Sequence, residues 1–231
     1  MTMRRLGLTL RVVSAVGYDE PRDAISHDWI TWLATQDIEP VLLSNAAADP
    51  VAHARAANLD GLILSSGNDV VRRTDGGDYS ALRNRAEGAL LDWAMAAGLP
   101  VLGVCRGLHM INAHCGGRVR ADIREDLPGV ASHVACQHRI QLLPAFAEGL
   151  GITSTETNSY HRQGLAVADL APALAAFALS DDGIVEGLVH RQLPVLAVQW
   201  HPERPGSCSR LDHTLFRRLL DQSAFWKEWF K

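Results

Sequence analysis

The sequence lacks the features of a membrane protein and of a nucleic-acid binder. None of its apolar runs is long enough to span a bilayer, and no basic run stands out in a chain with a net charge of −4. The basic and then apolar start, MTMRRLGLTLRVV, is interrupted by Arg11 and lacks a small-residue cleavage site, so we interpret it as a strand rather than a signal peptide. We therefore expect a cytoplasmic protein with no nucleic-acid or membrane partner.

Cysteine is scarce as well. The chain has four cysteines, at positions 105, 115, 136 and 208, and none of them forms a C-x-x-C pair. A disulfide scaffold and a zinc site are therefore not expected, and the histidines at 114, 133 and 213 show no metal-ligand spacing along the chain. We expect reduced thiols, no bound metal and no cofactor.

The remaining sequence alternates short apolar runs with helical patterns. Hydrophobic residues make up 47% of 231 residues, and no repeat, low-complexity segment or linker divides them, so we expect a single domain over residues 1–231. Strands alternating with helices predict an α/β fold with a mostly parallel sheet covered by helices on both faces. The predicted strands are Leu6–Val12, Pro40–Leu43, Gly61–Leu64, Val101–Val104, His138–Leu142, Ala173–Ser180, Ile184–His190 and Val195–Gln199, and the predicted helices are Ala24–Thr35, Pro50–Ala57, Ser80–Ala97, Leu108–His114 and Arg210–Ser223.

The stretch GVCRGLHM, residues 103–110, places a cysteine in a sharp turn between a strand and a helix. Gly-x-Cys-x-Gly is the thiol form of a nucleophile elbow, in which the flanking glycines allow strand and helix to pack closely. A thiol at a helix N-terminus is favoured as the thiolate, and the backbone N–H of Arg106 is placed to bind an oxyanion. On this pattern alone, a packed and inert Cys105 is an equal alternative.

A second motif supplies a base. In VLAVQWHPER, residues 195–204, an apolar strand is followed by His201 and Glu203. Histidine can deprotonate a thiol and later protonate a leaving amine, and a carboxylate can hold its tautomer. A third motif, LILSSGNDVV, ends a buried strand at Gly67, whose N–H would be the second oxyanion donor, although Ser-Gly-Asn-Asp is also ordinary turn chemistry.

Together these motifs resemble the class I glutamine amidotransferase-like hydrolases, which include the γ-glutamyl hydrolase peptidases of type C26. The resemblance rests on the elbow at 103–107, on His201 and Glu203, on Gly116–Gly117 and on TNSYHRQG at 157–164. It implies a flavodoxin-like fold with an additional small antiparallel part. It also implies that Cys105 forms a glutamyl thioester from a γ-glutamyl amide. The implied substrate-binding residues are His109, Asn158, Ser159, Tyr160 and His161.

The sequence departs from the family pattern at two places. His109 stands where amidotransferases usually carry the glutamine that helps to hold free glutamine, and Ser66 replaces the first of two glycines on the oxyanion strand. Both departures argue against plain glutaminase activity.

The loop after the first predicted strand contains Arg11 and Arg22, which are suited to phosphate, although a solvated loop is an alternative. This stretch is similar to a branch of the family linked to capsular sugar modification, which hydrolyses γ-glutamyl-CDP-amidate. We therefore expect a γ-glutamyl amide hydrolase acting on a small molecule. The alternatives are a γ-glutamyl-polyamine or γ-glutamyl-GABA hydrolase, a glutaminase subunit feeding ammonia to a partner synthase, and a non-catalytic binding module. The oligomeric state is left open, with a homodimer as one option.

Overall fold

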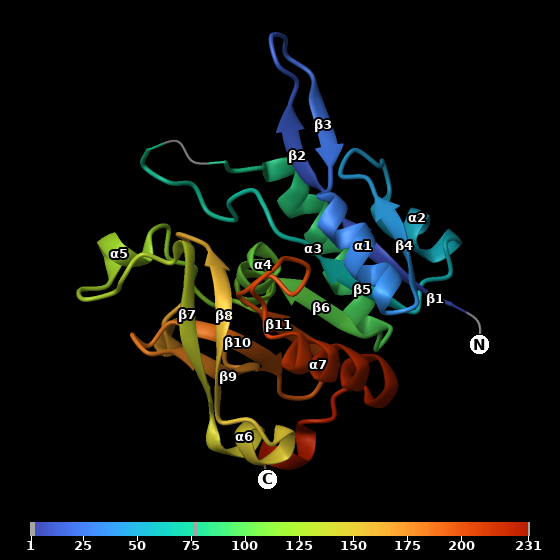
Figure 1. The fold of residues 1–231 in the computed structure, drawn as a ribbon. Helices are drawn as coiled ribbons and strands as arrows, with labels where there is room; N and C mark the ends of the chain where they lie inside the picture. Colours follow the sequence, from blue (N-terminus) through green and yellow to red (C-terminus); the bar gives the residue numbers. More distant parts are fainter. Residues whose placement is uncertain (1–2, 76–77, 231) are drawn as a thin grey trace.

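A nine-stranded sheet forms the centre of the protein (Figure 1). The structure is a computed structural model and describes residues 3–75 and 78–230. The strand order is β4-β1-β5-β6-β11-β10-β9-β7-β8, in which the first five strands are parallel and the remaining four are antiparallel. The strands are β1 (Arg4–Thr9), β4 (Ile38–Leu43), β5 (Gly61–Leu64), β6 (Val101–Val104), β7 (Val134–Leu142), β8 (Ser154–Tyr160), β9 (Leu174–Ser180), β10 (Val185–His190) and β11 (Val195–Val198).

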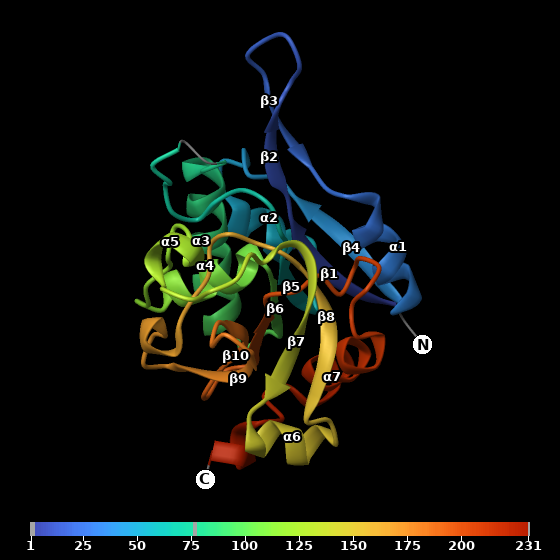
Figure 2. The same cartoon turned by 60° about the vertical axis from the view of Figure 1, so that its left-hand side comes forward.

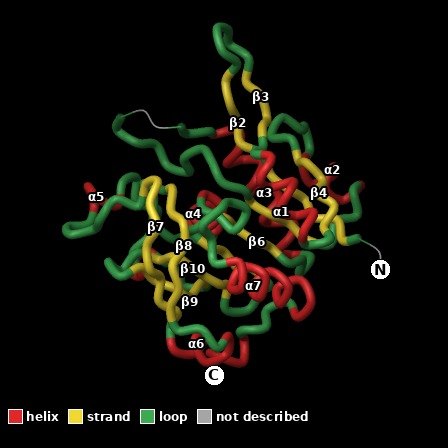
Figure 3. Tube along the Cα trace, in the orientation of Figure 1, coloured by secondary structure: helices red, strands yellow, loops and turns green. Residues whose placement is uncertain are grey.

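Helices cover both faces of this sheet, as the alternating pattern predicted (Figure 3). One buried cluster contains side chains of α1 and α7, and a second contains side chains of α2, α3 and α4. The strands between these layers are buried on both faces; in β5, for example, Ile63 belongs to the first cluster and Leu62 to the second. The helices are α1 (His27–Thr35), α2 (Pro50–Ala56), α3 (Ala81–Ala96), α4 (Arg106–His114), α5 (Ile123–Asp126), α6 (Pro144–Leu150) and α7 (Ser209–Gln222), with 3-10 turns at Val167–Asp169 and Lys227–Phe230.

The antiparallel part is larger than the sequence predicted. The strand β8 was missed because its sequence, STETNSY, is polar, and it lies at the edge of the sheet beside β7 (Figure 2). The strand predicted at Leu6–Val12 is also corrected, since it divides at Leu10 into β1 and β2 (Arg11–Ser14). β2 pairs with β3 (Pro21–Ala24) in a two-stranded hairpin that projects from the body (Figure 1). No helix among the described residues is both long and apolar enough to cross a membrane.

Candidate active site

Cys105 occupies a strained turn between β6 and α4. Its backbone has φ 52° and ψ −100°, which an L-residue rarely adopts. The turn is possible because the flanking glycines leave no Cβ. A Cβ on Gly107 would lie 2.3 Å from the carbonyl oxygen of Leu64, and one on Gly103 would lie 2.8 Å from the backbone of Gly107. The thiol is therefore held at the carboxyl edge of the parallel strands, where it lines a pocket.

His201 and Glu203 reach the same edge from β11, which pairs with β6. The Nδ1 atom of His201 lies 2.8 Å from Oε1 of Glu203, and both side chains are buried. Within the described part of the chain, Nε2 of His201 has no hydrogen-bond partner. His201 lines the same pocket as Cys105. The ring is thus held through one nitrogen while the other is available for proton transfer.

The neighbouring charges control the protonation of this histidine. Burial lowers the pKa of His201, but the negative charge of the Cys105 thiolate and the Glu203 carboxylate outweigh burial and raise the pKa to about 9. The imidazolium form of His201 is therefore favoured at neutral pH.

Two residues predicted to bind substrate instead make contacts inside the protein. Asn158 Nδ2 donates to the backbone oxygen of His201 at 2.9 Å, and Ser159 Oγ donates to the backbone oxygen of His133 at 2.8 Å. Both side chains are buried, and neither lines the pocket. Tyr160, the last residue of β8, and His161, in the loop that follows, do line the pocket. The ring of Tyr160 meets His201 edge to face, 5.5 Å away, and His161 lies on the same wall.

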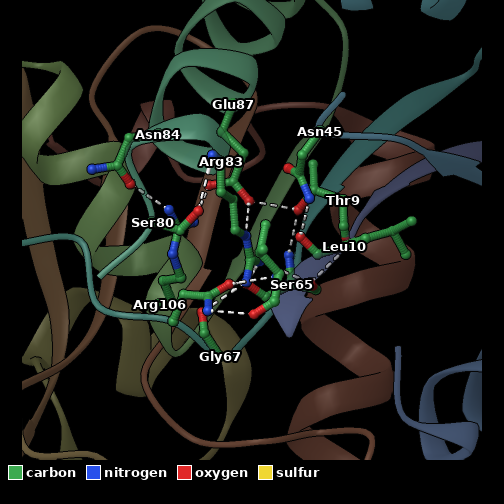
Figure 4. A network of polar contacts seen from close by, with 12 residues as sticks. Thr9, Leu10, Asn45, Ser65, Gly67, Ser80, Arg83, Asn84, Glu87 and Arg106 are labelled. Atoms are coloured by element: carbon green, nitrogen blue, oxygen red, sulfur yellow. Dashed lines mark hydrogen bonds and ion pairs between the residues drawn. The ribbon is translucent and has the colours of Figure 1, made fainter. Parts of the chain in front are cut away.

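On the other side of Cys105, Arg83 holds the loop that contains Gly67 (Figure 4). Its guanidinium donates to the carbonyl oxygens of Ser65 at 2.7 Å, Ser66 at 2.9 Å and Gly67 at 2.7 Å. In a trans peptide the N–H points away from the preceding C=O. Because the Ser66 carbonyl faces Arg83, the N–H of Gly67 is directed away from Arg83, and Gly67 itself lines the pocket.

Glu87 links Arg83, which holds the Gly67 loop, to the elbow around Cys105. It accepts from Arg83 Nε at 2.8 Å, from Thr9 Oγ1 at 2.7 Å and from the guanidinium of Arg106 (Figure 4). Burial raises the pKa of Glu87, but Arg106 and Arg83 more than compensate and hold the pKa below its usual value. The side chain of Arg106 is therefore structural, while its backbone N–H lies in the first turn of α4, where N–H groups lack intrahelical partners. No motif in the sequence revealed this network, although the Arg83–Glu87 spacing of four residues on a helix is a usable signal.

His109 lines the pocket in a neutral form. Its Nε2 lies 2.8 Å from Oε1 of Gln199, and burial lowers its pKa to about 3. It therefore offers hydrogen bonding but no positive charge to a substrate.

The two arginines predicted to bind phosphate lie on the two paired strands of the hairpin, Arg11 on β2 and Arg22 on β3. Arg11 lines the pocket, next to Gly67, and its guanidinium lies 3.2 Å from Asp78. Arg22 does not line the pocket. It lies on β3, where it bonds to Glu20 at 2.6 Å and contacts Tyr18.

The pocket has a volume of about 300 Å³ and a basic lining. Besides Arg11, three arginines that the sequence analysis did not single out reach it from separate loops. These are Arg73, Arg162 and Arg204, against the carboxylates of Asp69 and Asp78. No short motif connects them, so only the fold reveals the cluster.

The chain is similar to known proteins over most of its length. The family model for peptidase C26 matches residues 10–203. The glutamine amidotransferase-like protein YvdE of Lactococcus lactis is 32% identical over 171 residues, covering 68% of this chain and 72% of its own. The γ-glutamyl-γ-aminobutyrate hydrolase PuuD of Escherichia coli K12 is 30% identical over 205 residues, covering 78% and 79%. Among solved structures, the glutaminase domain of Trypanosoma brucei CTPS with bound acivicin matches with a TM-score of 0.64 at 15% identity, covering 96% of this chain and 95% of that one.

Proposed function

The chain belongs to the peptidase C26 family of class I glutamine amidotransferase-like hydrolases, and from that premise we propose that it hydrolyses a γ-glutamyl amide with Cys105, His201 and Glu203 as its catalytic triad. One observation carries the proposal. A cysteine in a strained elbow and a histidine held by a buried glutamate open into the same pocket.

The reaction proceeds in two steps. The Cys105 thiolate attacks the γ-carbonyl carbon, and the N–H groups of Gly67 and Arg106 stabilise the oxyanion. The His201 imidazolium donates its proton to the departing nitrogen, so that the C–N bond breaks and a glutamyl thioester remains. Neutral His201 then takes a proton from water, and the hydroxide cleaves the thioester to glutamate and the free thiolate. No metal or cofactor takes part in either step.

The basic lining indicates the class of leaving group. Four pocket arginines besides Arg106 favour an anionic group beyond the scissile bond, even though Asp75 and Asp78 pair with three of them, because arginine suits bidentate phosphate binding. The substrate we propose is γ-glutamyl-CDP-amidate, whose hydrolysis gives glutamate and cytidine diphosphoramidate in capsule phosphoramidate biosynthesis. Arg11 would contact the diphosphate. Tyr160, His161 and His109 would line the glutamyl side.

γ-Glutamyl-γ-aminobutyrate is the second candidate substrate, since the relative PuuD is named as a hydrolase of this compound. The leaving group of this substrate, γ-aminobutyrate, carries one carboxylate. The larger positive charge of the lining favours the more highly charged nucleotide. A glutaminase subunit would bind neither the nucleotide nor γ-aminobutyrate, because the leaving group of free glutamine is ammonia.

The test compares glutamate release from glutamine, γ-glutamyl-γ-aminobutyrate and γ-glutamyl-CDP-amidate. We expect Cys105→Ala to abolish release from all three. Arg11→Ala should lower kcat/KM on the nucleotide by about 10-fold or more, with little change on glutamine, while Arg22→Ala, the matched control on the hairpin, should behave as wild type. Turnover by Cys105→Ala would refute the mechanism, and equal kcat/KM on all three substrates would refute the nucleotide assignment.

A further inference from the structure

Behind the His161 wall of the pocket, three histidines surround a buried glutamate. His133 precedes β7, His138 lies on β7, His161 follows β8, and Glu186 lies on β10. The side chains of His133, His161 and Glu186 are at most 2% exposed, and that of His138 is 16% exposed. None of the four belongs to the triad.

The carboxylate of Glu186 is close to all three rings, yet it forms no hydrogen bond. Its Oε1 lies 3.4 Å from Nδ1 of His133 and 3.5 Å from Nε2 of His161, and its Oε2 lies 3.5 Å from Nε2 of His138. Among the described residues, neither Glu186 oxygen nor His138 Nε2 has a hydrogen-bond partner. A buried carboxylate that has only these long ion-pair contacts and no short hydrogen bond is costly, so a positive charge is needed among these atoms.

In His161 and His133, one ring nitrogen points away from Glu186 and is hydrogen-bonded. This determines which ring nitrogen faces Glu186. His161 Nδ1 lies 2.9 Å from the carbonyl oxygen of Gln163, which can only accept, so Nδ1 carries the hydrogen. His133 Nε2 lies 3.1 Å from the Asp182 carboxylate and donates to it. In neutral rings, the lone pairs of His133 Nδ1 and His161 Nε2 then face each other at 3.1 Å. Such a pair requires a proton or a metal ion between its members.

A metal ion can engage Nδ1 of His133, Nε2 of His138 and a Glu186 oxygen at once. A proton shared by His133 and His161 instead leaves His138 Nε2 with only a long contact to Glu186 Oε2, at 3.5 Å. Donors at 2.0–2.1 Å from a tetrahedral zinc ion lie about 3.4 Å apart, and the contacts of Glu186 with His133 and His138 are 3.4 and 3.5 Å. Zinc-ligating histidines also typically donate their other N–H to a carboxylate or a carbonyl, as His133 and His161 do.

We propose that His133, His138 and Glu186 bind a divalent ion of the zinc class. Their donor atoms all lie within 4.8 Å of one another. Nε2 of His161 lies outside this set, 3.1 Å from Nδ1 of His133, and is the candidate for the fourth position of a tetrahedral ion. Such a site ties β7 to β10 next to the pocket wall that carries His161. The ion reaches the site through a surface cavity of about 400 Å³ lined by His133 and His138. Linear spacing gave no hint of the site because Glu186, on β10, is far along the chain from the two histidines at β7.

The test measures metal binding in the Cys105→Ala background, so that the catalytic thiol cannot capture the ion. Untagged protein is stripped with a chelator, returned to chelator-free buffer and titrated calorimetrically with Zn²⁺. We expect one ion per chain with sub-micromolar affinity, a rise in Tm on binding, and the intense visible absorption of tetrahedral Co²⁺ when cobalt replaces zinc.

Glu186→Gln and His138→Ala should each lose this binding, and His138→Ala, at the partly exposed ligand, should preserve the fold. Asp182→Asn should weaken binding by about 10–100-fold. His213→Ala removes an exposed histidine on α7 and serves as the control. A parent protein that takes up no zinc, or an affinity unchanged in Glu186→Gln, would overturn the proposal. Because the background is inactive by design, neither outcome depends on the proposed hydrolase activity.

Discussion

Asn158 and the backbone of His201 are joined by two hydrogen bonds. The amide nitrogen of Asn158 donates to the His201 carbonyl oxygen at 2.9 Å, and the His201 N–H donates to Oδ1 of Asn158 at 2.9 Å. This pair ties the loop that carries the base to β8, so the position of the imidazole depends on a residue that does not line the pocket.

Replacing Asn158 with alanine should therefore lower kcat much more than it changes KM. A displacement of about 1 Å at a catalytic group can cost about 100-fold in rate, and we expect a loss of that order. Steady-state kinetics on the substrate with the highest kcat/KM measures the changes in kcat and in KM separately. Ser159→Ala is the matched control, since Ser159 is buried on the same strand but bonds to His133 rather than to His201. A large rise in KM with unchanged kcat would instead assign Asn158 to substrate binding.

The pH profile should have an alkaline limit set by His201. In the proposed mechanism the His201 imidazolium donates the proton to the leaving nitrogen, and with a pKa of about 9 it is present below pH 9 and lost above it. We expect kcat/KM to fall as the pH rises through about 9. Glu203→Gln removes one of the charges that raise this pKa, so its alkaline limb should move to lower pH. A limb that stays in place or moves upward in this variant would contradict the assigned role of Glu203.

Glu87→Gln should destabilise the fold strongly. The substitution leaves the buried guanidinium groups of Arg83 and Arg106 without the carboxylate between them, and breaking such a pair costs about 3–5 kcal/mol. Urea unfolding gives the change in the free energy of unfolding. Glu39→Gln, in an exposed pair with Arg5, should cost less than about 1 kcal/mol. Equal effects for the two variants would mean that the network contributes little.

Asp212 should make stability fall as the pH rises. Burial raises its pKa to about 7, while Trp200 Nε1 donates to its Oδ1 at 2.6 Å. The unfolded chain ionises this group near pH 4, so it binds fewer protons than the folded chain between pH 4 and 7, and stability declines across that range.

Asp212→Asn keeps an acceptor for Trp200 and removes the ionisation. At pH 8 the variant should be more stable than wild type, by up to about 4 kcal/mol, and at pH 4 the difference should vanish. Thermal melting at the two pH values measures this. Asp221→Asn, at an exposed aspartate, is the control. A variant that is less stable than wild type at pH 8 would show that the charged form is favoured.

The sequence indicated which residues meet at the ends of the parallel strands better than it predicted the structure around them, and their catalytic roles stay a prediction. The elbow at Cys105 and the pair His201 and Glu203 are local patterns, so a short stretch suffices to recognise them. The strand β8 could not be recognised, because STETNSY lacks the apolar alternation of a strand and its burial comes from partners across the sheet. Arg11 and Arg22 were indistinguishable in sequence, and the fold places them on the two paired strands of one hairpin, where Arg11 lines the pocket and Arg22 does not.

The pairing of β6 with β11 also has a consequence during synthesis. The two strands join Val101–Val104 to Val195–Val198, which lie on either side of residues 105–194. A ribosome releases Cys105 long before it releases His201, and long-range pairings of this kind form late. A nascent chain therefore holds Cys105 without His201 beside it, and the two side chains come to line one pocket only when β11 is inserted beside β6. The proposed nucleophile and the proposed base thus meet only once the pocket itself exists.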